Sequence, residues 1–277
     1  MSSARQKPAS PAAWVVVTIA VLIVGFVIGA PLASVFVAAF SRGTGAFFSA
    51  ITAPDAIAAL QLTLLTVAIV VPANTVFGLA AAWAITKFEF RGKGILAAII
   101  DLPLAVSPVV AGLMLVLVFG ARGLFGPFLV DSGIKVIFGT PGIVLATMFV
   151  TLPFVAREVI PVMRACGSDD ETAARSLGAG GWQMLWRVTL PNVRWSLVYG
   201  ALACAGRSVG EFGAVSVVSG HIRGETNTLS LHVEALYNEY DQAGAFAVAA
   251  LLASFSLFAL AARKVIEARF GGGGGKA

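Results

Sequence analysis

The feature that most constrains this chain is a series of apolar runs that recur along nearly its whole length. The first run, residues 14–40, contains no charged residue and exceeds the roughly 20 residues that a helix needs to cross a bilayer. Five further runs follow it, at residues 56–86, 95–119, 142–163, 196–218 and 243–262. Because lipid offers no hydrogen bonds to the backbone, each run must satisfy its own polar groups as a helix. The sequence therefore predicts an all-α integral membrane protein with six transmembrane helices.

Composition agrees with this prediction and sets the expected domain limits. The chain is 58% hydrophobic and 12% charged, which excludes a soluble globular domain. A cleaved signal peptide is the alternative for the first run, since Arg5 and Lys7 precede it. That run is longer than the apolar core of a signal peptide, about 7–15 residues, so an uncleaved first span is favoured. We expect an N-terminal tail at residues 1–13, a six-span domain at 14–270 and a flexible Gly-rich tail at 271–277.

The distribution of basic residues predicts how the spans are oriented. Six spans place both termini on the same side of the membrane. If that side is the cytoplasm, the outside segments hold only Arg42, Arg122, Lys135 and Arg223, and most other Lys and Arg residues lie inside. The positive-inside rule therefore places both termini, and also residues 168–192, in the cytoplasm.

Residues 168–192 form the longest polar interruption of the apolar pattern. Ser168 is a candidate N-cap, and the acidic residues after it, including Glu171, suit the positive end of a helix. On that helix Ala173, Ala174 and Leu177 share one face. Three glycines (Gly178, Gly180 and Gly181) are expected to end it, because glycine accepts the left-handed conformation common at helix C-termini.

A second short helix is predicted over residues 182–190, where apolar side chains recur at helical spacing. We expect it to stop before Pro191, directly after Leu190. Two short helices with a small, smooth alanine face suit a groove on another protein. The alternative is an ordinary loop helix that lies on the membrane surface.

Two spans contain polar or helix-breaking residues that are candidates for a translocation path. The third span carries Asp101 and then Ser107-Pro108, where proline removes a backbone donor and breaks the helix. This break either is a packing kink or lines a path. Asp101 either belongs to that path or pairs with Arg207.

The fifth span places Arg207 and Glu211 four residues apart, on one helix face. Ionisable groups within a membrane usually face protein or a water-filled cavity. The two side chains either neutralise each other as a structural pair, or Arg207 attracts an anion while Glu211 holds it in place. Small residues around them, with Ser216 and Ser219 as further path candidates, allow either close helix packing or a narrow pore.

The spacing within residues 168–192 resembles a known motif. Ala173-Ala174, three residues, Gly178, nine residues and then Val188-x-Leu-Pro are similar to the EAA loop of ABC importer permeases. In that family the loop forms coupling helices that dock on the ATPase subunit. The family's glutamate directly before Ala-Ala falls at Thr172 in this chain, and Glu171 lies one residue early, about 100° away around a helix.

Three further blocks resemble the sulfate/molybdate branch of these permeases, and in particular the W-type permease of the sulfate/thiosulfate importer. The blocks are RSVGEFGA, which begins at Arg207, GWQMLWRVTLPN at 181–192, and DLPLAVSPVVAG, which begins at Asp101. The similarity extends from about residue 31 to residue 269. It implies a MetI-like permease fold and transport of sulfate or thiosulfate across the bacterial inner membrane. Molybdate, tungstate or another oxyanion is the alternative substrate.

The resemblance also implies partners and the absence of chemistry in this chain. The expected assembly is a heterodimer with a second homologous permease, two ABC ATPase subunits and a periplasmic sulfate/thiosulfate-binding protein, surrounded by membrane lipid. ATP and Mg²⁺ would bind to the ATPases, so we expect no catalytic site, cofactor or metal here, and no nucleic acid partner. A non-conducting membrane scaffold and a secondary transporter are the alternatives from other classes.

Other candidate motifs do not support chemistry. The glycines at 271–275, followed by Lys276 and Ala277, imitate part of a P-loop, but the final Ser/Thr is missing and no strand precedes them. His221 and His232 lack neighbours at metal-ligand spacing. Cys166 and Cys204 are too few for a disulfide framework and are expected to stay reduced.

Overall fold

The computed structural model of the chain describes residues 11–270, and every regular element in that range is a helix. This confirms the predicted all-α class. The predicted tail at 271–277 lies outside the described residues, as does most of the one at 1–13. The first helix already begins at Pro11, three residues before the first predicted span.

Four helices within residues 11–270 are long and apolar enough to cross a membrane. They are α1 (Pro11–Ala39), α3 (Pro54–Lys87), α7 (Thr140–Ala165) and α13 (Gln242–Phe270). A fifth candidate is the pair α4 (Lys93–Ala105) and α5 (Pro108–Phe119), if both halves count as one span. The predicted number of six is compatible with this arrangement, and it stays a prediction.

The third and fifth predicted spans are broken helices. The break in the third span lies at Ser107-Pro108, as the proline there predicts, whereas the break in the fifth span was not predicted. The axes of α4 and α5 differ by 112° across Val106 and Ser107. Val106 is extended, and Ser107 has a ψ of 134°, outside the helical region, because the ring of Pro108 disfavours the helical conformation in the residue directly before it. The fifth span consists of α10 (Leu190–Val209) and the short α11 (Gly213–Val218), separated at Gly210.

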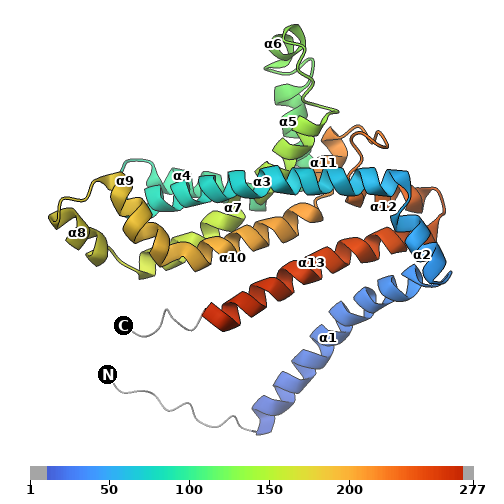
Figure 1. The fold of residues 1–277 in the computed structure, drawn as a ribbon, viewed down its shortest axis with the longest axis horizontal. Helices are drawn as coiled ribbons and strands as arrows, with labels where there is room; N and C mark the ends of the chain where they lie inside the picture. Colours follow the sequence, from blue (N-terminus) through green and yellow to red (C-terminus); the bar gives the residue numbers. More distant parts are fainter. Residues whose placement is uncertain (1–10, 271–277) are drawn as a thin grey trace.

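Short helices lie at the two ends of the molecule. One end carries α8 (Asp169–Ser176), α9 (Gly181–Met184) and the π-helix η1 (Leu185–Thr189), and the other carries α2 (Thr44–Ile51) and α12 (Leu229–Asn238) (Figure 1). The pair of α5 and α6 (Gly126–Asp131) projects sideways from the long helices (Figure 1). Helix α1 begins, and α13 ends, toward the end that carries α8.

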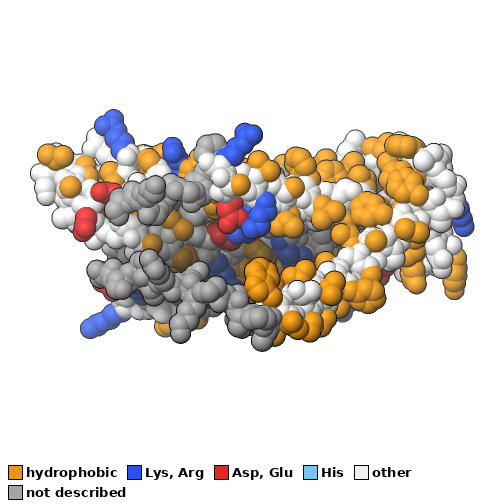
Figure 2. Space-filling model, turned by 90° about the horizontal axis from the view of Figure 1, so that it is seen from below, with side chains coloured by type: hydrophobic (Ala, Val, Ile, Leu, Met, Phe, Trp, Pro, Cys, Tyr) orange, Lys and Arg blue, Asp and Glu red, His pale blue; other side chains and the backbone are white. Residues whose placement is uncertain are grey.

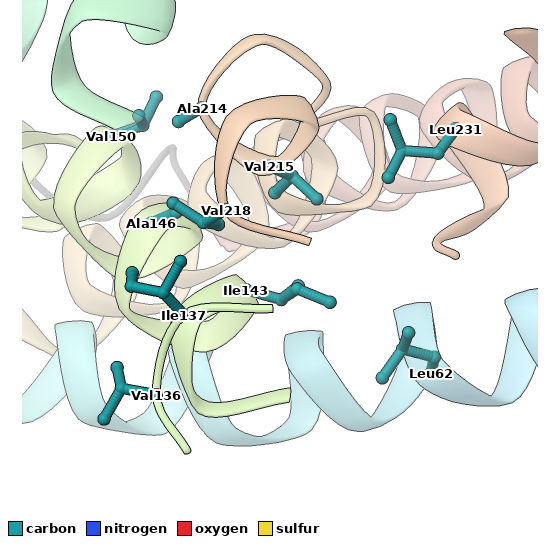
Figure 3. Packing of buried hydrophobic residues seen from close by; sticks show 10 residues of the cluster. All are labelled: Leu62, Val136, Ile137, Ile143, Ala146, Val150, Ala214, Val215, Val218 and Leu231. Atoms are coloured by element: carbon teal, nitrogen blue, oxygen red, sulfur yellow. The ribbon is translucent and has the colours of Figure 1, made fainter. Parts of the chain in front are cut away.

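The centre of the bundle is held by apolar packing and by one buried amide. Leu62 of α3 packs with residues of α7, α11, α12 and the 136–137 segment in a common core (Figure 3). Asn74 of α3 is buried, and its amide donates to the Met148 carbonyl at 3.1 Å and to the Thr151 hydroxyl at 2.9 Å, both in α7. Such interhelical hydrogen bonds stabilise helix contacts in an apolar medium, where no water competes.

Large apolar side chains cover much of the outside of the molecule. Figure 2 shows a broad apolar area on one face, and α1 is exposed along almost its whole length, with Trp14 64% and Phe26 74% accessible. Exposure of such a large apolar surface to water is unfavourable, whereas lipid tails or a second membrane subunit can cover it. The exposed surface therefore agrees with a membrane protein.

Candidate functional site

Helix α8 opens the polar 168–192 segment and presents the predicted alanine face. None of its residues is buried. Ala173 and Leu177 are exposed, Leu177 to 89%, while Ala174 is half-buried. A leucine this exposed beside small side chains offers a knob that another surface can cover.

Gly178 ends α8 as predicted, because its φ of +84° is the left-handed conformation that glycine adopts without strain. The amide of Ala179 donates to the Ala174 carbonyl at 3.0 Å, and that of Gly178 donates to the Arg175 carbonyl at 3.0 Å. Gly180 and Gly181 do not end this helix. Gly180 has a φ of −71° and is the N-cap of α9, and Gly181 is the first residue of α9.

The prediction that the second short helix stops before Pro191 was wrong. Helix α9 continues through η1 into α10, so that Leu190 and Pro191 form the first turn of a long helix. Pro191 has no N–H to donate to the preceding turn. A π-helical turn precedes this proline, and in it the Leu190 amide donates a hydrogen bond five residues back, to the Leu185 carbonyl.

Glu171 is turned toward the bundle, away from the exposed face of α8. Its carboxylate lies 3.0 Å from Lys87 Nζ, at the end of α3, and accepts a hydrogen bond from the Thr189 hydroxyl at 2.6 Å. Thr172, in the position of the family's glutamate, is exposed and its hydroxyl donates to the Ser168 carbonyl at 2.8 Å. Glu171 therefore faces a different direction from Thr172, as their offset on the helix predicts.

Arg207 and Glu211 form the predicted ion pair, with Arg207 Nη1 2.7 Å from Glu211 Oε2. The Glu211 side chain is only 1% exposed and that of Arg207 is 36% exposed. Glu211 also stabilises the break between α10 and α11. Its Oε1 accepts the Ala214 amide at 3.1 Å, and its carbonyl accepts the Ser230 hydroxyl of α12 at 2.7 Å.

Asp101 does not pair with Arg207, which corrects that alternative. Its carboxylate lies 3.2 Å from Arg157 Nε on α7, and both side chains are more than half exposed. The two residues line a cavity of about 230 Å³ that also includes Arg164. This position, close to the end of the bundle that carries α8, separates Asp101 from the Arg207–Glu211 pair.

The two helix breaks meet each other, and this brings Ser107-Pro108 beside the start of α11. A Cβ added to Gly213 would lie 2.9 Å from Pro108 Cβ, and one added to Gly112 would lie 2.8 Å from the Ala214 carbonyl oxygen. Glycine is required for this approach. Broken helices that meet inside a membrane are typical of transporter ion sites, because their ends carry free backbone groups.

The two serine candidates, Ser216 in α11 and Ser219 directly after it, have hydroxyl groups that already form hydrogen bonds within the chain. The hydroxyl of Ser216 donates to the Gly213 carbonyl at 2.9 Å, and the Ser219 side chain is fully buried and accepts the His221 amide at 3.1 Å. The first bond lies within α11, and the second stabilises the turn after it. Ser107 is exposed and makes no side-chain capping bond.

Residues 11–270 contain no group of three or more His, Cys, Asp or Glu that could hold a metal ion. His221 lies 4.0 Å from Glu234, and Cys166 and Cys204 are not paired with each other. Burial and the nearby Arg223 guanidinium lower the pKa of His232 in α12, so that its ring is neutral at physiological pH.

Comparison with known proteins places this architecture in a family. Residues 74–272 match the family model described as "Binding-protein-dependent transport system inner membrane component". The match covers the polar 168–192 segment and both helix breaks, and the chain belongs to this family of multi-pass membrane permeases, which are subunits of ABC importers.

Among individual relatives, the chain is similar to sulfate permeases over almost its full length. It is 51% identical to the sulfate transport system permease protein CysW of Synechococcus elongatus, over 91% of this chain and 88% of the relative. It is 44% identical to CysW of Escherichia coli K12, over 95% and 90%. The identity to the second Escherichia coli permease, CysT, is lower, at 36% over 87% of each chain.

Solved structures agree on the fold. A crystal structure of a bacterial alginate ABC transporter, in complex with a pentasaccharide-bound periplasmic protein, contains a chain with a TM-score of 0.75 and 17% identity. The similarity covers 92% of this chain and 94% of that one. At this identity the comparison supports the MetI-like permease fold alone.

Proposed function

We propose that this chain is the W-type permease subunit of an ATP-driven importer for sulfate and thiosulfate. The observation that carries the substrate is the 51% identity with a sulfate permease over 91% of the chain. That similarity includes the 101–112 and 207–214 blocks, which form the two broken helices. Molybdate or tungstate transport is the less favoured alternative, because these similar relatives are sulfate transport permeases.

The path for the anion runs, in this proposal, along the meeting point of the helix breaks. Ser107 and Arg207 offer a hydroxyl and a partly exposed guanidinium in an otherwise small and apolar environment. A partly exposed cation in a medium of low dielectric constant attracts a dianion more strongly than it would in water. The chain itself performs no chemistry, and ATP with Mg²⁺ binds to partner ATPases.

The proposed assembly contains a second, homologous permease of the CysT kind, two ABC ATPases and a periplasmic sulfate-binding protein. The exposed knob formed by Ala173 and Leu177 is the surface that docks on an ATPase. Both termini are cytoplasmic in this arrangement, since α1 begins and α13 ends toward the end that carries α8 (Figure 1). The positive-inside distribution supports the same orientation.

Growth on different sulfur sources tests the proposed substrate. A strain without this gene should fail to grow on sulfate or thiosulfate as its only sulfur source, and cysteine should restore growth. Re-expression of the chain should restore growth on sulfate, whereas molybdate-dependent enzyme activity should be unaffected throughout. Normal growth on sulfate with loss of molybdate-dependent activity would contradict the proposal and favour the alternative oxyanion.

A further inference from the structure

Helix α8 is joined to the membrane bundle by polar contacts at its first turn, without apolar burial. None of its residues is buried, and its C-terminal half ends at the exposed Leu177 and Gly178. A helix of eight residues is too short to be stable by itself. Its position must therefore be set by the contacts of its N-terminal turn.

Three side chains from three elements meet at that turn, and we call them the clamp: Lys87 of α3, Glu171 of α8 and Thr189 of η1. Lys87 Nζ lies 3.0 Å from Glu171 Oε2 and also donates to the carbonyl of Gly167, two residues before α8 begins. Thr189 donates to Glu171 Oε1 at 2.6 Å. The Lys87 and Glu171 side chains are each only 11% exposed.

The clamp links α8 to α3 and, through η1, to α10, the helix that carries the path candidate Arg207. Helix α3 ends at Lys87, and Thr189 directly precedes α10, which leads to Arg207. A second link supports the first, since Asn192 of α10 donates to Asp170 of α8 at 3.1 Å. A rotation of α8 therefore moves the end of α3 and the start of α10 together.

We infer that Lys87 and Glu171 are positioning residues, which transmit movement of α8 to the membrane helices. Glu171 is not free to contact an ATPase, because both of its oxygens are engaged inside the chain and its side chain is nearly covered. This inference rests on the proposed coupling of α8 to an ATPase. The transmission itself depends only on contacts within this chain.

The test replaces Lys87 by Met in the complete transporter, reconstituted in proteoliposomes. The variant keeps the length of the side chain and removes its charge, so that the carboxylate of Glu171 loses its partner. The number of sulfate ions transported per ATP hydrolysed should fall about tenfold, because ATP hydrolysis continues while movement of α8 no longer reaches the membrane helices. Lys87→Arg keeps the charge and should retain most of the sulfate transported per ATP hydrolysed.

The matched control is Lys93→Met, which removes an ion pair with Glu89 at 2.7 Å on the same side of the molecule. Glu89 is 91% exposed, and such exposed pairs contribute little, so the ratio should be unchanged. If Lys87→Met lowers uptake and ATP hydrolysis in proportion, the residue has only a structural role and the inference is overturned.

A second readout does not depend on transport. Hydrogen exchange of the amides in residues 169–176 should become about tenfold faster in Lys87→Met than in the parent protein, and should stay unchanged in Lys93→Met. Failure of the parent complex to transport sulfate would refute the proposed function alone. Unchanged exchange in α8 would refute the clamp, whatever the substrate is.

Discussion

Replacing Arg207 by Gln is expected to remove most of the assembled protein from the membrane. The change leaves the Glu211 carboxylate, with a side chain that is 1% exposed, without its cation at 2.7 Å. Stranding a buried charge costs about 3–5 kcal/mol. The loss also reaches the break between α10 and α11, because Glu211 holds the Ala214 amide. Thermal stability of the purified variant and its yield in the membrane measure the effect.

A double-mutant cycle separates the structural role of Arg207 from a role in the path. The double change Arg207→Gln with Glu211→Gln should restore assembly, since neither residue is then charged. If uptake remains absent in that protein while assembly returns, Arg207 attracts the anion, and Arg207→Lys should retain part of the uptake. If uptake returns as well, Arg207 is a structural partner only.

The matched control for this cycle is Arg157→Gln, which breaks the pair with Asp101. Both of those side chains are more than half exposed, so the substitution should lower the free energy of unfolding by no more than about 1 kcal/mol. If Arg157→Gln lowers stability as much as Arg207→Gln does, burial of Glu211 is not the reason why the Arg207–Glu211 pair is needed.

Replacing Gly178 by Val should leave the protein inserted in the membrane and abolish its coupling. A Cβ at Gly178 would meet no atom within 4 Å, so steric obstruction by neighbours is not the reason. The cause is the φ of +84°, which costs an ordinary L-residue about 1–2 kcal/mol and a β-branched one more. The end of α8 would unwind, and the knob around Leu177 would lose its position. Co-purification of the ATPase and sulfate uptake should both fall at least about tenfold.

Two other substitutions calibrate this result. Gly178→Asn should be milder, because asparagine tolerates the left-handed conformation better than other residues with side chains. Gly180, in the same segment, has a φ of −71°, and a Cβ added to it would meet no atom within 4 Å. Gly180→Ala should therefore behave like the parent. Equal activity of Gly178→Val and Gly180→Ala would exclude the segment from the coupling mechanism.

Most of the fold follows from local features of the sequence. Apolar runs located the long helices because length and hydropathy alone decide what crosses a membrane. Gly178 was predicted correctly as a helix end for the same kind of local reason. The continuation of α9 through η1 was not predictable, since a π-helical turn before Pro191 depends on how the following helix packs.

The partners of charged residues were predicted less well, because pairing depends on distances between helices. Arg207 and Glu211 lie four residues apart, so their pairing is local and was anticipated. Asp101 pairs across the bundle with Arg157, and Glu171 pairs with Lys87, 84 positions away in the chain. One weak signal was available for the second pair: Lys87 directly follows the second predicted span on the cytoplasmic side, where residues 168–192 were also placed.

The most direct test of the account is transport by a defined complex. Proteoliposomes would contain this chain, its permease partner and the ATPases, with the sulfate-binding protein on the outer side and ATP on the ATPase side. We expect uptake of radiolabelled sulfate that requires both ATP and the binding protein, and that falls at least about tenfold when Gly178→Val replaces the parent chain. Uptake that is driven by an ion gradient without ATP, or no uptake although the complex is fully assembled, would contradict it.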